Sequence, residues 1–165
     1  MLVRVDLSRI LIREMTDTQF ITLEECEGTR QFPIAIGLPE AFAIERRLRK
    51  IEAPRPQTHD LLSSVLAHMG GVLTRIVIHS LEDGTFFANI VVEQDGEEIE
   101  IDSRPSDAIA LGVAEDVPMF VEETVLSEAS QDAIANSGQG DGSESSMDWS
   151  SDLDEDEDDE DDSWL

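Results

Sequence analysis

The sequence predicts an α+β fold in which long antiparallel hairpins alternate with three main helices. Runs in which apolar and polar residues alternate are typical of half-buried strands. Between these runs, apolar residues recur at helical spacing. The segment 39–44 is weakly repeated at 105–111, and each copy follows three predicted strands. We therefore predict two strand-strand-strand-helix units with an extra helix between them, and mixed or antiparallel sheets rather than a doubly wound parallel sheet.

The first unit begins with an alternating strand over residues 2–12. Two more strands are predicted over residues 19–24 and 30–36, with Gly28 in the loop between them. Pro33 lacks the amide hydrogen that a central strand would donate. The third strand is therefore expected at a sheet edge.

The helix that follows opens near Pro39, where a missing amide hydrogen is harmless. Its apolar residues predict one buried stripe, made of Ala41, Ile44, Leu48 and Ile51. Two prolines within residues 53–56 end this helix. Thr58 is the expected N-cap of a second helix over residues 59–69, which a glycine pair ends.

The second unit repeats this order. Its strands are predicted over residues 72–81, 85–93 and 97–102. Asp-Gly pairs at 83–84 and 95–96 predict tight hairpin turns between them. Pro105 begins the third helix, a short strand covers residues 117–121, and residues 122–129 form a last helical turn or two.

Charge divides the chain into two parts. It has 165 residues with 38 acidic and 11 basic side chains, a formal net charge of −27. Residues 131–165 contain 14 carboxylates and no Lys or Arg. A segment of this composition cannot bury enough apolar surface to fold, so we predict a folded domain over residues 1–130 and a disordered acidic tail over residues 131–165. Trp149 and Trp164 in the tail indicate either a short docking motif or a solvating segment.

The composition also excludes several classes of protein. No apolar run approaches the ~20 residues of a membrane span, and no secretory signal is expected at the charged N-terminus. Cys26 is the only cysteine, which excludes an internal disulfide, a cysteine-based zinc site and a CxxC redox pair. We therefore expect a cytoplasmic protein without membrane association. Its net negative charge repels phosphate, which excludes a broadly basic nucleic-acid-binding surface.

Two short segments contain residues suited to phosphate chemistry. His59 and Asp60 begin the second predicted helix, where a His can act as a general base and an Asp can bind a metal or orient the His. Asp102 and Arg104 point to the same side of a strand end, and Asp107 lies in the first turn of the third helix. Such carboxylates can hold Mg²⁺ or Mn²⁺, and the Arg can bind phosphate oxygens. Helix capping and local ion pairing explain the same residues without catalysis.

Five of the 11 basic residues crowd into positions 46–55, namely Arg46, Arg47, Arg49, Lys50 and Arg55. Arg46, Arg49 and Lys50 have the spacing of one helix face, opposite the predicted apolar stripe. This face is the best candidate for binding a phosphate backbone. The alternative is an ordinary solvated helix face.

Four segments, in their order along the chain, resemble the bifunctional nuclease (BFN) family. They are Pro54-Arg-Pro-Gln-Thr-His-Asp-Leu-Leu62, Asp83-Gly-Thr-Phe86, Asp102-Ser-Arg-Pro-Ser-Asp-Ala-Ile-Ala-Leu111 and Pro118-Met-Phe-Val121. The resemblance covers nearly all of residues 1–121. It implies a compact α+β domain, a homo-oligomer, and DNase and RNase activity, and it assigns no catalytic residue.

The leading hypothesis is a metal-assisted nuclease that cleaves DNA, RNA or both with little sequence preference. Asp102 and Asp107, with help from Asp60, bind the divalent cation. His59 activates water, and Arg104 stabilises charge on the phosphorane-like transition state. The residues expected to hold the nucleic acid backbone are Arg46, Arg49, Lys50 and Arg55.

Two further hypotheses do not require catalysis. The net acidity and the capping explanations favour a non-catalytic interaction or regulatory module. The tail provides the other: its carboxylates mimic nucleic acid and occupy the basic helix intramolecularly, at high effective concentration.

Overall fold

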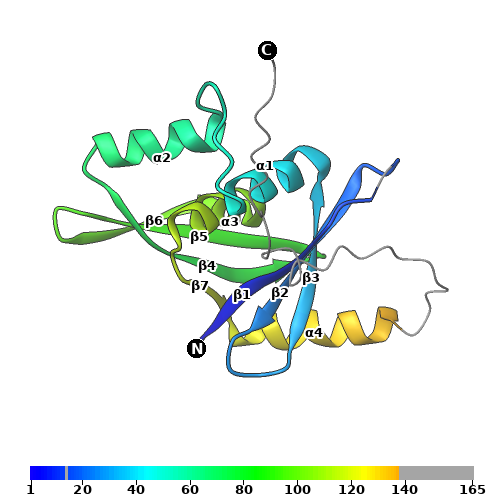
Figure 1. The fold of residues 1–165 in the computed structure, drawn as a ribbon. Helices are drawn as coiled ribbons and strands as arrows, with labels where there is room; N and C mark the ends of the chain where they lie inside the picture. The colour runs from blue at the N-terminus through cyan, green and yellow to red at the C-terminus, as the bar shows by residue number, and fades with distance from the viewer. Residues whose placement is uncertain (14, 138–165) are drawn as a thin grey trace, which may run out of the picture.

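A seven-stranded mixed sheet organises the chain, with the strand order β3-β2-β1-β7-β4-β5-β6 (Figure 1). The structure, a computed structural model, describes residues 1–13 and 15–137. The strands are β1 (Leu2–Leu11), β2 (Thr18–Glu25), β3 (Gln31–Gly37), β4 (Val72–Glu82), β5 (Thr85–Gln94), β6 (Glu97–Ser103) and β7 (Met119–Glu122). The helices are α1 (Leu38–Leu48), α2 (Thr58–His68), α3 (Pro105–Glu115) and α4 (Glu123–Ser137). The predicted α+β class with a mixed sheet is confirmed.

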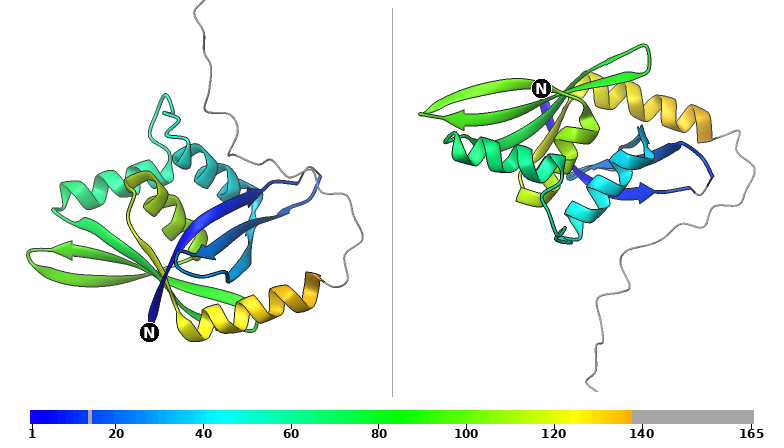
Figure 2. Two further views of the ribbon diagram at one scale, coloured as in Figure 1. Left: turned by 60° about the horizontal axis from the view of Figure 1, so that its bottom comes forward. Right: turned by 90° about the horizontal axis from the view of Figure 1, so that it is seen from above.

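Two antiparallel three-stranded units form the two halves of the sheet. The unit β1-β2-β3 leads into α1, and the unit β4-β5-β6 leads into α3, as the internal repeat predicts. Strand β7 joins the halves, because it pairs antiparallel with β1 and parallel with β4. The views in Figures 1 and 2 place α1, α2 and α3 on one side of the sheet and α4 on the other.

Local backbone chemistry accounts for the edge strand and the hairpin turns. Pro33 lies in β3, which is an edge strand as predicted. Both residues of each Asp-Gly turn have positive φ, 50° and 77° at Asp83 and Gly84, and 54° and 82° at Asp95 and Gly96. Two successive positive φ values define a type I′ turn, whose twist matches that of the flanking strands.

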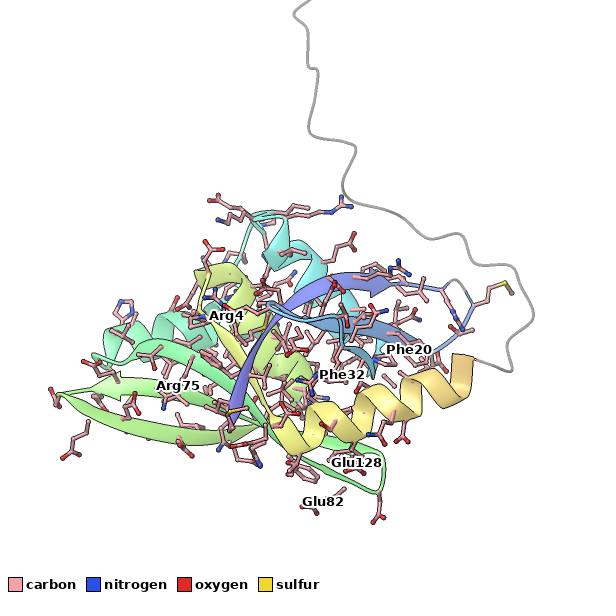
Figure 3. All side chains as sticks on the ribbon, turned by 90° about the horizontal axis from the view of Figure 1, so that it is seen from below. Arg4, Phe20, Phe32, Arg75, Glu82 and Glu128 are labelled. Atoms are coloured by element: carbon pink, nitrogen blue, oxygen red, sulfur yellow. The ribbon has the colours of Figure 1, made fainter. Side chains whose placement is uncertain are left out.

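The two halves of the sheet share one apolar core. Phe32 of β3 stacks on Phe86 of β5, with the ring centroids 5.5 Å apart. Figure 3 shows Phe32 near the middle of the molecule and Glu128 at its rim. Helix α3 approaches β4 so closely that a Cβ added at Gly112 would overlap Cδ1 of Ile76. This packing fixes the position of α3, and with it the position of its first turn.

Helix α1 is rotated relative to the predicted apolar stripe. Ala41 and Ile44 are buried as expected, but Leu48 and Ile51 are 44% and 51% exposed. Arg47 is buried instead, with 6% of its surface exposed. The helix ends at Leu48, and the Arg47 guanidinium finds hydrogen-bond partners on two other helices. The prediction that Leu48 and Ile51 belong to the core was therefore wrong.

The N-cap of α2 is Gln57, one residue before the predicted Thr58. The side chain of Gln57 accepts a hydrogen bond from the amide at N3, which is Asp60, and the Asp60 carboxylate accepts one from the Gln57 amide at 3.0 Å. This reciprocal pair is a capping box. None of the residues of α2 is buried, although Leu66 packs against the core, so polar contacts contribute much to the position of this helix.

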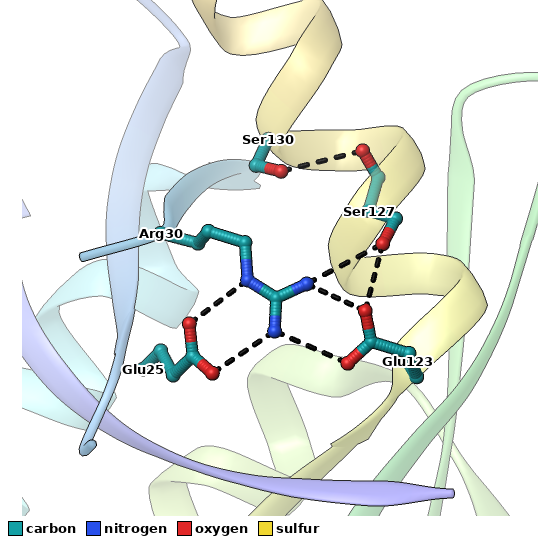
Figure 4. A network of polar contacts seen from close by, with 5 residues as sticks. All are labelled: Glu25, Arg30, Glu123, Ser127 and Ser130. Carbon is teal, nitrogen blue, oxygen red and sulfur yellow. Dashed lines mark hydrogen bonds and ion pairs between the residues drawn. The ribbon is translucent and has the colours of Figure 1, made fainter. Parts of the chain in front are cut away.

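A network centred on Arg30 holds α4 against the β2–β3 loop (Figure 4). Arg30 donates Nε and Nη2 to Glu25 at 2.8 and 2.9 Å, and Nη1 and Nη2 to Glu123 at 2.6 and 3.1 Å. Ser127 donates a further hydrogen bond to Glu123 at 2.9 Å. The hydrogen bond from Arg30 lowers the pKa of Glu123 to about 2.

Helix α4 is longer than the helical turn or two predicted here, and it crosses the predicted domain boundary at residue 130. Residues 138–165, which make up most of the expected disordered tail, lie outside the described residues. None of the helices that the structure describes has the length and apolar character needed to cross a membrane.

Candidate functional site

The first turns of α2 and α3 bring three of the predicted site residues together. His59 Nε2 lies 3.0 Å from Asp107 Oδ1, although 48 residues separate them in the chain. Arg104, the N-cap of α3, donates Nε to Asp107 Oδ2 at 2.8 Å and Nη2 to Asp107 Oδ1 at 3.3 Å. Its Nη1 donates to Glu40 Oε1 of α1 at 2.9 Å. We call these four side chains the His59 network.

Helix starts place the two carboxylates of this network. Pro105 begins α3 directly after β6 and puts Asp107 in the first turn. Pro39 does the same for α1 and Glu40. A carboxylate in the first turn of a helix is stabilised by the helix dipole. Both carboxylates converge on the same guanidinium, that of Arg104.

Asp107 is ionised in this arrangement. Burial raises the pKa of its carboxyl, but the hydrogen bonds from Arg104 and His59 outweigh burial, so the pKa lies below its usual value. A carboxylate only accepts hydrogen bonds, so Nε2 of His59 carries the proton that they share. In the tautomer with its single proton on Nε2, Nδ1 is the acceptor of the ring.

A pocket of about 450 Å³ opens beside Arg104. Its walls include Gly37 and Glu40 from the start of α1, Ser106 from the start of α3, and Phe86 from β5. The side chain of Arg104 is 64% exposed, so its guanidinium is open to a ligand in this pocket. The N-terminal ends of two helices favour an anionic ligand there, while the Glu40 carboxylate opposes one. Glu40 and Ser106 were not predicted as site residues from the sequence. The one signal that could have indicated them is their position near the start of a predicted helix.

Asp60 contacts α1 rather than the His59 network. Its Oδ2 accepts hydrogen bonds from Arg46 Nη2 at 2.8 Å and from the Gln57 amide at 3.0 Å. Its Oδ1 accepts from Arg46 Nη2 at 2.9 Å and from Arg47 Nη1. Burial raises the pKa of the Asp60 carboxyl, but the hydrogen bonds from Arg46 and Gln57 outweigh it, and the pKa lies below its usual value. With both oxygens engaged, Asp60 has the geometry of a structural anchor.

Arg47 is the second half of this anchor. Its burial was not predicted from the sequence. Its Nε donates to the Ala110 carbonyl of α3 at 2.6 Å, and its Nη2 donates to Ser63 of α2 at 3.1 Å. One guanidinium therefore links α1, α2 and α3. Helical periodicity alone could not indicate this, because the partners lie 13, 16 and 63 residues away.

The predicted metal ligands do not form a shared three-carboxylate site. Asp102 is exposed on β6, opposite Asn89 of β5, whereas Asp60 and Asp107 serve the separate contacts described above. Within residues 1–13 and 15–137, no three His, Cys, Asp or Glu side chains lie close enough together to bind a metal ion.

The predicted nucleic-acid-binding residues do not form one exposed face. Arg46 is largely enclosed between α1 and α2, where it pairs with Asp60. Arg49, Lys50 and Arg55 are exposed. Two of these cations lie 3.3 Å from carboxylates, in the pairs Arg49–Glu45 and Lys50–Asp116.

Comparison with known proteins agrees with the resemblance seen in the sequence. Residues 21–133 match the family model of the bifunctional nuclease domain. Two proteins of Mycobacterium tuberculosis, MT1877 of strain CDC 1551 / Oshkosh and Rv1829 of strain ATCC 25618 / H37Rv, are each 37% identical to this chain over 120 residues. The aligned region covers 73% of this chain and 71% of each relative, and both relatives are described as uncharacterized proteins. Residues 21–133, the region that matches the family model, contain the whole His59 network.

Proposed function

Because the chain belongs to the bifunctional nuclease domain family, we propose that it hydrolyses phosphodiester bonds in DNA, RNA or both, with little sequence preference. The observation that carries this proposal is the contact of His59 with Asp107 and of Asp107 with Arg104, of which Arg104 lines the 450 Å³ pocket. Phosphodiester hydrolysis needs a base that deprotonates water and a cation that stabilises charge on the phosphate. The His59 network offers both groups side by side. We place this activity in the cytoplasm, as the sequence leads us to expect.

In the proposed reaction, Asp107 holds the His59 ring with Nδ1 as the acceptor, and Nδ1 takes a proton from the attacking water as the water oxygen bonds to phosphorus. The bond from phosphorus to one ester oxygen of the backbone breaks, and the departing alkoxide takes a proton from solvent. Arg104 stabilises the charge that develops on the phosphate. A guanidinium has five N–H donors, and three of those of Arg104 are engaged with Asp107 and Glu40. One donor on each of Nη1 and Nη2 is left for phosphate oxygens, which suits a bidentate contact. Arg49, Lys50 and Arg55 are the candidate contacts to the nucleic acid backbone.

Assistance by a divalent metal stays a prediction. Mg²⁺ keeps several of its waters and often uses only one or two protein carboxylates, for which Asp102 and Asp107 are the candidates. In that case activity depends on Mg²⁺ or Mn²⁺ and is lost in EDTA. If the His59 network acts alone, EDTA leaves the activity unchanged.

The test uses the full chain with single-stranded DNA and RNA, in Mg²⁺, in Mn²⁺ and in EDTA. We expect His59→Gln to lower the cleavage rate by at least about 100-fold, because a positioned base contributes that much or more. His68→Gln is the matched control, since His68 is an exposed histidine at the other end of the same helix. A rate that is the same in wild type and His59→Gln would refute the role of His59 and indicate a contaminant or other catalytic residues.

A second proposal, an interaction module that assembles as a homo-oligomer, rests on α2. Three apolar side chains of α2 are exposed, those of Leu61, Leu62 and Val65, and so is that of Met69 directly after the helix. Residues 61–74 contain no Asp, Glu, Lys or Arg, so two copies can join through this face without the like-charge repulsion expected elsewhere on an acidic chain. We expect sedimentation velocity to show an oligomer that Val65→Asp dissociates. A monomer in the wild type would refute this proposal and leave the nuclease proposal untouched.

A further inference from the structure

The outer side of α1 carries a groove that combines apolar and cationic side chains. The groove has a volume of about 330 Å³. It is lined by Phe42, Glu45 and Arg46 of α1, by Arg49 directly after this helix, and by Ile51 and Gln57 of the α1–α2 linker. Phe42 and Ile51 are about half exposed, at 52% and 51%. A half-exposed aromatic ring beside guanidinium groups is suited to a ligand that is both apolar and anionic.

The surroundings of the groove hold the main concentration of positive charge in this acidic chain. Residues 46–55 contain five of the 11 basic residues and one carboxylate, Glu52. Several carboxylates face these cations from neighbouring positions, namely Glu45, Asp60 and Asp116. The Lys50–Asp116 pair is highly exposed at both ends. Such an exposed ion pair contributes little free energy and exchanges readily for another carboxylate.

We propose that this groove binds the chain's own C-terminal segment, residues 154–165, with Trp164 in contact with Phe42 and Ile51. Residues 138–165 contain 13 carboxylates and no Lys or Arg, and nine of these carboxylates are consecutive at 154–162. The acidic run pairs with the exposed cations around the groove, Arg49, Lys50 and Arg55, and takes the place of Glu45 and Asp116 in two of these pairs. The indole occupies the apolar part of the groove. Charge and apolar character are therefore both complementary between this segment and the groove.

The segment is long enough to reach the groove. Residues 138–153, the 16 residues that connect Ser137 to the segment, can extend to roughly 50 Å. A domain the size of residues 1–137 has a diameter of roughly 40 Å. Because the segment is covalently attached, its local concentration near the groove is high, and a weak contact suffices to keep the groove occupied.

Tryptophan fluorescence tests this proposal on the full chain without nucleic acid. The chain contains no Tyr and only two Trp, at 149 and 164, so its tryptophan emission reports these two positions alone. The two single-tryptophan variants separate them. In Trp149→Phe, where only Trp164 emits, we expect blue-shifted emission and acrylamide quenching reduced to about half or less of that in Trp164→Phe, because the groove shields the indole. Salt near 1 M, where the Debye length is about 3 Å, should increase the quenching.

Groove variants decide whether the shielding arises at this surface. Phe42→Asp adds a like charge to the groove and should bring the quenching of Trp164 up to that of Trp149. Val72→Asp places the same charge at an exposed apolar residue elsewhere and should leave the quenching of Trp164 low. Equal quenching in the two single-tryptophan variants, or no effect of Phe42→Asp, would overturn the proposal. Shielding that grows with protein concentration would also overturn it, since the segment would then be binding a second copy. Each readout is independent of catalysis, so failure of this proposal does not affect the nuclease proposal.

Discussion

The Asp60 anchor should make a measurable difference to stability, and Asp60→Asn isolates it. This substitution keeps the shape of the side chain but removes its charge and places an amide NH₂ group among N–H donors. Arg47 would then remain buried without an ionic partner, keeping its hydrogen bonds to Ala110 and Ser63. The carboxylate that completes the capping box of α2 would also be lost.

The size of the effect follows from burial. Removing one partner of a fully buried ion pair costs about 3–5 kcal/mol. Arg47 is nearly fully buried, but the side chain of Asp60 is 28% exposed, so solvent reduces this to about 2 kcal/mol. Weakening the cap adds about 1 kcal/mol. We therefore expect Asp60→Asn to lower the free energy of unfolding by about 3 kcal/mol.

Urea unfolding followed by circular dichroism measures this change. The midpoint should fall while the slope with denaturant stays constant, because the buried surface is the same. Glu98→Gln is the matched control, since it neutralises a carboxylate that pairs with Arg75 on the exposed side of β6, and it should cost less than about 1 kcal/mol. If Asp60→Asn costs no more than Glu98→Gln, Asp60 is not an anchor, and its assignment to structure rather than chemistry is mistaken.

Three further predictions concern the network centred on Arg30, the turn at Gly84 and the C-terminal residues 138–165. Glu25 and Glu123 have lowered pKa values because Arg30 donates hydrogen bonds to them, so their stabilisation is present above the ordinary carboxyl value of 4.5 and is lost as the pH falls through about 2 for Glu123; urea midpoints on acidification should fall more steeply in wild type than in Arg30→Met. Gly84→Ala, at φ 77°, should lower the free energy of unfolding by about 1 kcal/mol in the same assay, and an unchanged midpoint would show that the turn relaxes. Removal of residues 138–165 should strengthen binding of a single-stranded oligonucleotide at low salt, as measured by fluorescence anisotropy, because 13 carboxylates no longer compete; equal affinities would contradict this competition.

The strands and turns were predictable because their signals act over a few residues. An Asp-Gly pair determines the backbone of its own turn, and the missing amide hydrogen of Pro33 determines where β3 can lie in a sheet. The repeat of 39–44 at 105–111 indicated two similar units, because each copy begins a helix after three strands. The place of β7 between β1 and β4 had no such local signal, since it depends on pairing between segments far apart in the chain.

The rotation of α1 was not predictable from periodicity. The spacing of Ala41, Ile44 and Leu48 shows that they can share a face, but it does not show what the neighbouring helices offer to that face. In the structure, α2 presents the Asp60 carboxylate and α3 presents the Ala110 carbonyl. These groups accept hydrogen bonds from Arg47, which an apolar Leu48 side chain could not donate. For the same reason His59 and Asp107 could be named as candidates from their own segments, but their contact could not, because it depends on how α2 is placed.

His59 and Asp60 show why residue type and position in the chain do not assign a role. The two residues are consecutive, yet one contacts α3 and the other contacts α1. None of the residues of α2 is buried, and these two polar contacts hold its first turn against α1 and α3. Loss of Asp60 should therefore lower the proposed nuclease activity by displacing His59, even though Asp60 lies outside the His59 network. Two variants separate the positioning role from the chemical one. The activity of Asp60→Asn should recover at low temperature or with a bound oligonucleotide, in proportion to the fraction of folded protein. The activity of His59→Gln should stay low even when all of the protein is folded. A loss of activity in Asp60→Asn that persists when the protein is fully folded would instead assign Asp60 to the chemistry.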